Sequence, residues 1–150
     1  MNAANVIGVG GGGVDQAFNE EGGQPLISQR QQLPRVNSVG ARIPLGDSVV
    51  TEASGTILHA VGPDFRNCAK PIGMAILRAA YNSVLQTCQQ NGWDNVGFCL
   101  LSAGVFRGNV ALIEIISTAI DCLYGSDTAV LYCFTNEEFR LAKLLVQNKQ

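Results

Sequence analysis

The stretch from Asn2 to Asp15 constrains the fold and function of this 150-residue chain most strongly. It reads Asn-Ala-Ala-Asn, then a glycine-rich run with four consecutive glycines at positions 10–13, then Val14 and Asp15. Such a backbone can lie directly against a ligand, and consecutive backbone N–H groups form an anion-binding concavity. A helix predicted for residues 14–21 adds the positive end of its dipole. The stretch therefore predicts a phosphate-binding loop.

Other glycine-rich structures share parts of this pattern. A flexible linker also contains many glycines. Gly8, Gly10 and Gly13 fit the spacing of dinucleotide-binding loops, but that motif needs a preceding strand, and too few residues precede Gly8 for a full strand. The phosphate-loop pattern is excluded, because no Lys-Ser or Lys-Thr follows the glycines. Asp15 is interpreted either as a helix-start residue or as a carboxylate directed at the ligand.

The composition favours a single packed domain. Hydrophobic residues make up 47% of the chain and charged residues 15%. The net charge of −2 argues against general binding to nucleic acid or an anionic membrane, so phosphate binding should be local and made by the backbone. No apolar run is long enough to span a membrane, and no signal peptide is recognisable. Five cysteines without a Cys-x-x-Cys motif, and one histidine, argue against a zinc site and favour a reducing, cytoplasmic location.

Hydrophobic periodicity predicts strands and helices that alternate through the second half of the chain. Predicted helices cover residues 14–21, 26–33, 71–91, 109–124 and 137–149. Predicted strands cover residues 47–51, 56–61, 96–101 and 128–134, with an extended segment or edge strand at 37–45. Helices should therefore cover a mostly parallel sheet.

Several local signals refine these elements. Asn109 is a predicted N-cap, Gly92 a helix end, and Thr135 with Glu138 a capping box. The core-facing stripe predicted for helix 71–91 comprises Ile72, Ile76, Ala79, Ala80, Val84 and Cys88. The inward residues predicted for the last two helices are Ile113, Ile116, Ile120, Leu123, Phe139, Ala142, Leu145 and Val146. His59, the single histidine, lies in an apolar strand and is interpreted as a core residue with satisfied hydrogen bonds rather than a catalytic group.

A second small-residue loop follows the predicted strand 96–101. Residues 102–108 read Ser-Ala-Gly-Val-Phe-Arg-Gly and lead into a helix. A strand, a small-residue loop and a helix start together favour phosphate binding, although an ordinary connector also fits. In a parallel sheet, ligands bind beyond the carboxyl ends of the strands. The loops at 8–15 and 102–108 and the residue Phe134 should therefore meet at one end of the sheet.

These segments resemble the macro domain family, whose members bind ADP-ribose and in some branches hydrolyse its bonds to proteins. The resemblance rests on Asn2–Asp15, on Ile57–Pro63 and on Ser102–Gly108, and extends to about residue 147. It implies an α/β fold, a three-layer α/β/α sandwich with a mixed, mostly parallel central sheet. It implies no cofactor or metal, and as partner ADP-ribose or a mono-ADP-ribosylated protein.

The resemblance also implies roles for individual residues. Asn5 would orient the distal ribose, and Asp15 would position a water near the scissile carbon. Phe106 would pack on the distal ribose, whereas Phe134 would stack on adenine or be a core residue. The ADP-ribose-binding residues implied are Gly11, Gly12, Gly13, Val14, Ser102, Ala103, Gly104, Val105, Phe106, Arg107 and Phe134.

The expected function is hydrolysis of mono-ADP-ribose from modified protein side chains, with Asp15 as the key acid. On this hypothesis Asp15→Ala abolishes turnover and largely preserves ADP-ribose binding. The alternative is a reader that binds ADP-ribose without chemistry. An inert paralogue and a dinucleotide-dependent dehydrogenase are further alternatives.

The sequence departs from the family pattern in three places. Asn19 stands where many hydrolytic relatives carry histidine, and Arg107 replaces a glycine of the second loop. The strands that precede Asn-Ala-Ala-Asn in the family are not present, so residues 1–150 are expected to form one domain that is incomplete at its N-terminus. We expect self-association or another segment to supply a strand, because a sheet without its central strand leaves edges unpaired.

Overall fold

The computed structural model describes residues 1–150 and contains four α-helices and five short strands. The strands are β1 (Asn2–Ala3), β2 (Ser48–Thr51), β3 (Ile57–Ala60), β4 (Val96–Phe98) and β5 (Ala129–Leu131). The helices are α1 (Val14–Gln31), α2 (Lys70–Asn91), α3 (Leu112–Leu123) and α4 (Asn136–Lys149), with the 3₁₀ turn η1 at Val105–Arg107. No helix of the chain combines the length and the hydrophobicity of a membrane-spanning segment.

The strands form two hydrogen-bonded groups. In the first group β3 pairs in parallel with β1 and antiparallel with β2, in the order β1-β3-β2. In the second group β4 and β5 are parallel, with Val96 opposite Ala129. The amino group of Met1 donates to the carbonyl of Gly97 in β4, 2.5 Å away, and links the two groups. The prediction of a mixed, mostly parallel arrangement is confirmed.

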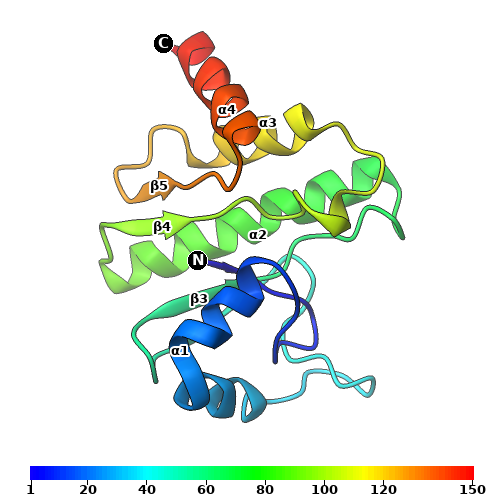
Figure 1. Cartoon of the computed structure of the whole chain (residues 1–150), viewed down its shortest axis with the longest axis vertical. Coiled ribbons are helices and arrows are strands. Elements are labelled where there is room, and N and C mark those ends of the chain that lie inside the picture. The colour runs from blue at the N-terminus through cyan, green and yellow to red at the C-terminus, as the bar shows by residue number, and fades with distance from the viewer.

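Helices cover both sides of the strands. Figure 1 shows α1 in front of the strands and α2 behind them, with α4 at one end of the molecule. Helix α3 packs against both α2 and α4. This arrangement is the predicted α/β/α sandwich (Figure 1).

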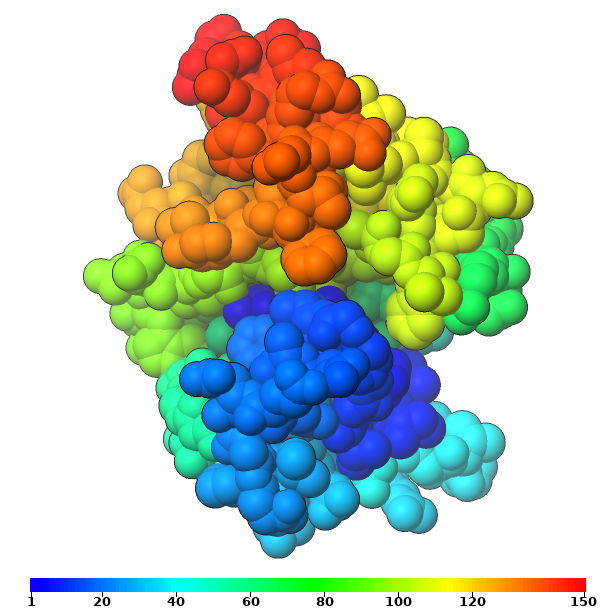
Figure 2. Space-filling model, viewed as in Figure 1, coloured from blue at the N-terminus to red at the C-terminus, as the bar shows by residue number.

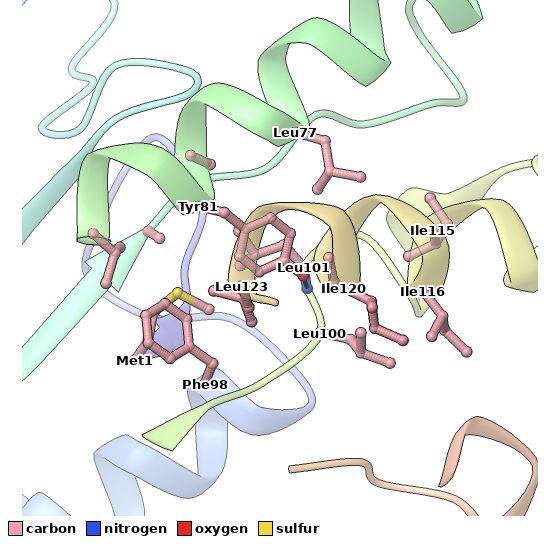
Figure 3. Packing of buried hydrophobic residues seen from close by; sticks show 14 of the residues in the cluster. Met1, Leu77, Tyr81, Phe98, Leu100, Leu101, Ile115, Ile116, Ile120 and Leu123 are labelled. Atoms are coloured by element: carbon pink, nitrogen blue, oxygen red, sulfur yellow. Dashed lines mark hydrogen bonds between the residues drawn. The ribbon is translucent and has the colours of Figure 1, made fainter. Parts of the chain in front are cut away.

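The main hydrophobic core lies between α2, α3 and β4. Figure 3 shows Leu77 and Tyr81 of α2 close to Leu101 and to Ile120 of α3. The Tyr81 hydroxyl accepts a hydrogen bond of 2.8 Å from the backbone N–H of Leu101, and burial raises the pKa of Tyr81. The core therefore fixes the backbone at the point where β4 leads into the loop at residues 102–108.

Several local predictions are confirmed. Gly23, with φ 64° and ψ −160°, interrupts α1 between the predicted helices 14–21 and 26–33, so α1 consists of two helical pieces. Gly92 ends α2 in a left-handed conformation. The backbone N–H of Glu138 donates to Thr135 Oγ1 at 3.1 Å, as expected of a capping box. The Glu138 carboxylate accepts from the N–H of Phe134 at 3.2 Å, one residue before the N-cap whose N–H a capping box uses.

Other predictions are wrong. Residues 37–45 form turns rather than a strand, held by Asn37, whose side chain accepts from the N–H groups of Val39 and Ala41. Helix α3 begins at Leu112, so Asn109 does not cap it. The strands expected at 96–101 and 128–134 are shorter than predicted.

The predicted inward faces also need correction. Ile72 is 60% exposed, Ala79 is exposed, and Leu77 and Tyr81 take their places in the core. Helix α2 is apolar on two adjacent stripes, and α3 and the strands that pack against α2 select between them. Ile113 and Phe139 are also exposed, whereas Ile116, Ile120, Leu123 and Ala142 are buried as predicted.

Candidate functional site

Residues 4–13, called loop 1 from here on, join β1 to α1 and carry a run of unused hydrogen-bond donors. None of the backbone N–H groups of Val9 to Gly13 has a partner within the chain. Gly11, Gly12 and Gly13 are exposed. Gly13 precedes the first residue of α1, so the positive end of the helix dipole lies beside these N–H groups. Loop 1 therefore has the properties of an anion-binding loop.

Asn5 shapes loop 1 from within. Its Oδ1 accepts from the N–H of Gly8 at 3.0 Å, and its Nδ2 donates to the carbonyl of Gly10 at 3.2 Å. A Cβ placed on Gly11 would lie 3.2 Å from Asn5 Nδ2 and 3.6 Å from Asp15 Oδ2. The two predicted catalytic side chains therefore meet directly beneath Gly11.

Asp15 lies in the first turn of α1 and is almost fully buried, with 2% of its surface exposed. Its Oδ1 accepts from Nη1 of Arg30 at 2.5 Å and from Nδ2 of Asn2 at 2.9 Å. Its Oδ2 accepts one longer bond, of 3.2 Å, from Nη2 of Arg30. Asp15 is a residue of the first helical turn, as one of its two interpretations states, and it forms an ion pair with Arg30 that the sequence did not predict.

His59 belongs to the same buried network. Its Nδ1 lies 2.9 Å from Asn2 Nδ2, which only donates, so the proton is assigned to Nε2, which lies 2.8 Å from Thr51 Oγ1. Burial and the nearby Arg30 cation lower the pKa of His59 to about 4. Its interpretation as a satisfied core histidine is confirmed.

Residues 102–108, called loop 2 from here on, carry a second run of unused donors. The N–H groups of residues 102–106 have no partner within the chain. Ser102 adopts φ 57°, an uncommon conformation for a residue with a side chain, and its Oγ donates to the carbonyl of Pro63 at 2.6 Å. The N–H of Phe65 donates to the carbonyl of Phe106 at 2.7 Å. Loop 2 is thus attached to the segment that follows β3.

Arg107 is directed along loop 2 itself. Its Nη1 donates to the carbonyl of Val110 at 3.0 Å, and its buried Nε has no partner. The Phe106 ring lies under the guanidinium of Arg66, 5.6 Å from the ring centroid. Arg107 therefore supports the turn between loop 2 and α3. The exposed residues of loop 2 are Gly104, Val105 and Gly108.

Phe134 follows β5 and is 95% exposed, which excludes the alternative of a core residue. Strands β1, β4 and β5 have their carboxyl ends on the same side of the molecule (Figure 1). Figure 2 shows the blue N-terminal segment, the yellow segment around residues 105–110 and the orange segment after β5 around one recess. The predicted site residues of loop 1, loop 2 and β5 therefore border a common surface.

A separate hollow of about 420 Å³ lies beside loop 2 and includes Phe65, Lys70, Gly108 and Glu114 in its lining. No residue of loop 1 lines it, and neither does Phe134. The Lys70 ammonium group in this lining forms an ion pair with Glu114, at 2.5 Å. The structure also contains no group of three or more His, Cys, Asp or Glu side chains that would hold a metal ion.

Three residues of the site were missed or misjudged from the sequence. Arg30 gave no signal, because it lies in a polar segment far from loop 1 in the sequence. Asn2 belongs to the recognised motif, but its bonds to Asp15 and His59 depend on the packing of β1 against β3. Asn19 was noted only as a departure from the family and proves to donate to the carbonyl of Val9 at 3.1 Å.

Comparison with known proteins identifies the family. A sequence profile described as Macro domain matches residues 1–114. Macro domain-containing protein SCO6450 of Streptomyces coelicolor is 33% identical over 111 residues, which are 71% of this chain and 64% of that protein. O-acetyl-ADP-ribose deacetylase 1 of Pantoea vagans is 31% identical over 150 residues, which cover 94% of this chain and 85% of that protein.

The fold points the same way. The Oceanobacillus iheyensis macrodomain, solved with ADP, aligns with a TM-score of 0.87 and 22% identity, over 99% of this chain and 82% of that chain. Together with the profile match, this agreement means that the chain belongs to the Macro domain family.

Proposed function

We propose that the chain binds ADP-ribose in the recess bordered by loop 1, loop 2 and Phe134. The observation that carries the proposal is the presence of two runs of backbone N–H groups without partners, at residues 9–13 and 102–106, at the same end of the parallel strands. A diphosphate offers enough acceptor oxygens for both runs. Binding by backbone amides also agrees with a net charge of −2, which provides no general attraction for anions.

The adenine and the distal ribose of ADP-ribose would contact different aromatic residues. The exposed ring of Phe134 provides a stacking surface for adenine. Phe106, in η1 of loop 2, provides an apolar surface for the distal ribose. The name of the Pantoea vagans relative, O-acetyl-ADP-ribose deacetylase 1, supports an ADP-ribose derivative as the ligand.

A substitution at Gly12 tests binding directly. A Cβ on Gly12 would meet no atom within 4 Å, and its φ lies outside the range that disfavours side chains. We expect Gly12→Leu to fold normally and to abolish ADP-ribose binding in calorimetry, because its side chain would occupy the surface where the diphosphate lies. Gln147→Leu, on the exposed part of α4, is the control and should bind like the wild type. Equal affinity of Gly12→Leu and wild type would refute the proposal.

We propose hydrolysis of an ester or glycosidic bond at the distal ribose as a second function of the same site. Asn5 Nδ2 and Asp15 Oδ2 would lie 3.2 Å and 3.6 Å from a Cβ on Gly11, and the resemblance implies that these side chains orient the distal ribose and a water. Asp15 Oδ2 accepts one bond only, so it retains lone pairs to orient a water. The deacetylase name of the 31% identical relative supports an acetyl ester as one substrate, and a mono-ADP-ribosylated protein side chain is the other.

A turnover assay separates the hydrolase from the reader. We expect release of acetate from O-acetyl-ADP-ribose or of ADP-ribose from a modified protein. Binding of ADP-ribose without turnover of either substrate would identify the chain as a reader and would leave the first proposal intact.

A further inference from the structure

Arg30 stands out because it is fully buried yet reaches three separate parts of the site. Its Nε donates to the carbonyl of Gly8 at 2.7 Å. Its Nη1 donates to Oδ1 of Asn19 at 2.8 Å, in addition to the ion pair with Asp15. With 0% exposure, Arg30 cannot touch a ligand. Any effect of Arg30 on binding must therefore pass through loop 1.

Three consecutive carbonyls of loop 1 are held by side chains. Arg30 holds the carbonyl of Gly8, Asn19 that of Val9 at 3.1 Å, and Asn5 that of Gly10 at 3.2 Å. In a planar trans peptide the C=O and the following N–H point in opposite directions. The N–H groups of Val9, Gly10 and Gly11 therefore point away from the protein groups that hold these carbonyls.

We propose that Arg30 and Asn19 are positioning residues that set the direction of the loop 1 amides for a diphosphate; the proposal rests on the proposed binding of ADP-ribose. Asp15 balances the charge of Arg30, so Arg30 acts through the geometry of its hydrogen bonds. Its planar group donates in several fixed directions at once, which a lysine ammonium cannot reproduce.

Gly10 gives independent support for this arrangement. A Cβ on Gly10 would lie 2.6 Å from Asn19 Nδ2, and the residue has φ 146°. A side chain at position 10 would therefore displace the Asn19 amide from its place between Arg30 and Val9. The glycine at this position is required by the group beneath the loop, on the side away from the proposed ligand.

The test uses the affinity for pyrophosphate, the smallest diphosphate ligand, to report whether the loop 1 amides are correctly oriented. Pyrophosphate is titrated into wild-type protein, Arg30→Lys, Asn19→Ala and the exposed control Arg140→Lys, and the backbone amide resonances are followed by NMR. We expect saturable shifts at residues 9–13 in the wild type and the control, and affinity about tenfold weaker in the two test variants, the effect of losing one hydrogen bond that involves a charged group. ADP-ribose affinity, measured by calorimetry, should fall by a similar factor.

Adenosine is the control ligand, because a variant that damages the whole fold would weaken adenosine binding as well as diphosphate binding. Adenosine lacks phosphate and should stack on Phe134, so its affinity should be the same in all four proteins. Equal pyrophosphate affinity in Arg30→Lys and wild type, or an equal fall for adenosine and ADP-ribose, would overturn the inference. If Arg30→Lys does not give the dispersed spectrum of a folded protein, Asn19→Ala decides, because it removes only the bonds to Val9 and to Nη1 of Arg30.

The outcomes also separate this inference from the proposed function. Wild-type protein that binds pyrophosphate through residues 9–13 but not ADP-ribose would refute the proposed function and support the role of Arg30, provided that Arg30→Lys weakens pyrophosphate binding. Wild-type protein that binds ADP-ribose without any change at residues 9–13 would support ADP-ribose binding but not binding through loop 1, and would overturn the role of Arg30.

Discussion

Loop 1 and loop 2 both present a run of free backbone N–H groups, but the molecule holds them by different means. Loop 1 lies on a buried polar network in which Arg30 and Asp15 form an ion pair and Asn19 reaches a backbone carbonyl. Loop 2 is held by its own 3₁₀ turn and by single contacts of Ser102 and Phe106 with the segment after β3. The same surface chemistry is therefore supported by a buried ion pair in one loop and by uncharged hydrogen bonds in the other.

The difference predicts where each loop is vulnerable. Buried charges are costly unless paired, so loop 1 depends on the Arg30–Asp15 ion pair beneath it. Loop 2 depends on close packing between its first residues and the segment Gly62–Phe65. The predictions that follow test these two dependencies.

Removal of one partner of the buried ion pair should have the largest effect. Arg30→Met leaves the Asp15 carboxylate buried without a cation, and we expect the free energy of unfolding to fall by about 3–5 kcal/mol in urea denaturation. Asp15→Ala leaves the Arg30 guanidinium buried without an anion. It should therefore lower the free energy of unfolding as well as any turnover, and the sequence did not predict this loss of stability. The double variant Asp15→Asn, Arg30→Met should lose less than either single change. A loss below about 1 kcal/mol for Arg30→Met would show that loop 1 does not depend on the pair.

The second largest effect should be a loss of stability at acidic pH, caused by His59 in the network beneath loop 1. Burial lowers the pKa of His59 from 6.5 to about 4, so between these values the unfolded chain binds a proton that the folded chain does not. Stability should therefore fall as the pH falls through this window, by about 2 kcal/mol between pH 7 and pH 5 and about 3 kcal/mol in total.

Urea denaturation at pH 7 and pH 5 checks this pH dependence. His59→Gln is the matched variant, because it has no titrating group and can still hydrogen-bond Asn2 and Thr51. The difference between the two pH values should be smaller in His59→Gln by about 2 kcal/mol. The same pH dependence in both proteins would show that His59 does not make the loop 1 network acid-sensitive.

The support of loop 2 can be disturbed through Gly62. A Cβ on Gly62 would lie 2.6 Å from Ser102 Oγ and 3.2 Å from Leu101 Cβ. We expect Gly62→Ala to lower the free energy of unfolding by about 1–2 kcal/mol, because the Ser102 hydroxyl is fixed by its bond to Pro63. Adding Ser102→Gly should restore part of the loss, since it removes the clashing oxygen and relieves the positive φ of residue 102. If the double variant is no more stable than Gly62→Ala, the loss of stability does not come from the contact between residue 62 and the Ser102 hydroxyl.

The two loops also differ in how well the sequence predicts them. Loop 2 and the N-cap at Thr135 have short local sequence patterns that identify them, although the bond from Ser102 to Pro63 that holds loop 2 joins residues 39 positions apart. The support of loop 1 is not local, because Arg30 is 22 positions from the Gly8 carbonyl that it holds. No periodic pattern marks that distance, and an arginine in a polar helix is ordinarily a surface residue.

The errors in the fold have a similar origin. Helix α2 was correctly located, but its inward stripe was misassigned at Ile72 and Ala79, because α3 and the strands that pack against α2 decide which of its apolar faces is buried. The segment at 37–45 has alternating apolar residues, which favoured a strand, but Gly40, Pro44 and the hydrogen bonds of the Asn37 side chain favour turns there. The fold class and the position of the site could thus be predicted from the sequence, whereas the buried contacts beneath loop 1 could not.

Phe134 belongs to neither loop and should give the smallest and most selective effect. Its ring is 95% exposed, so Phe134→Ala should leave the free energy of unfolding within about 0.5 kcal/mol of the wild type. Loss of adenine stacking should weaken ADP-ribose binding about tenfold, whereas ribose 5-phosphate, which has no adenine, should bind equally to both proteins. Phe139→Ala is the matched control, because Phe139 is an exposed phenylalanine of α4 outside the recess-forming segments. An unchanged affinity of Phe134→Ala for ADP-ribose would remove the third wall of the proposed site and leave recognition to the two loops alone.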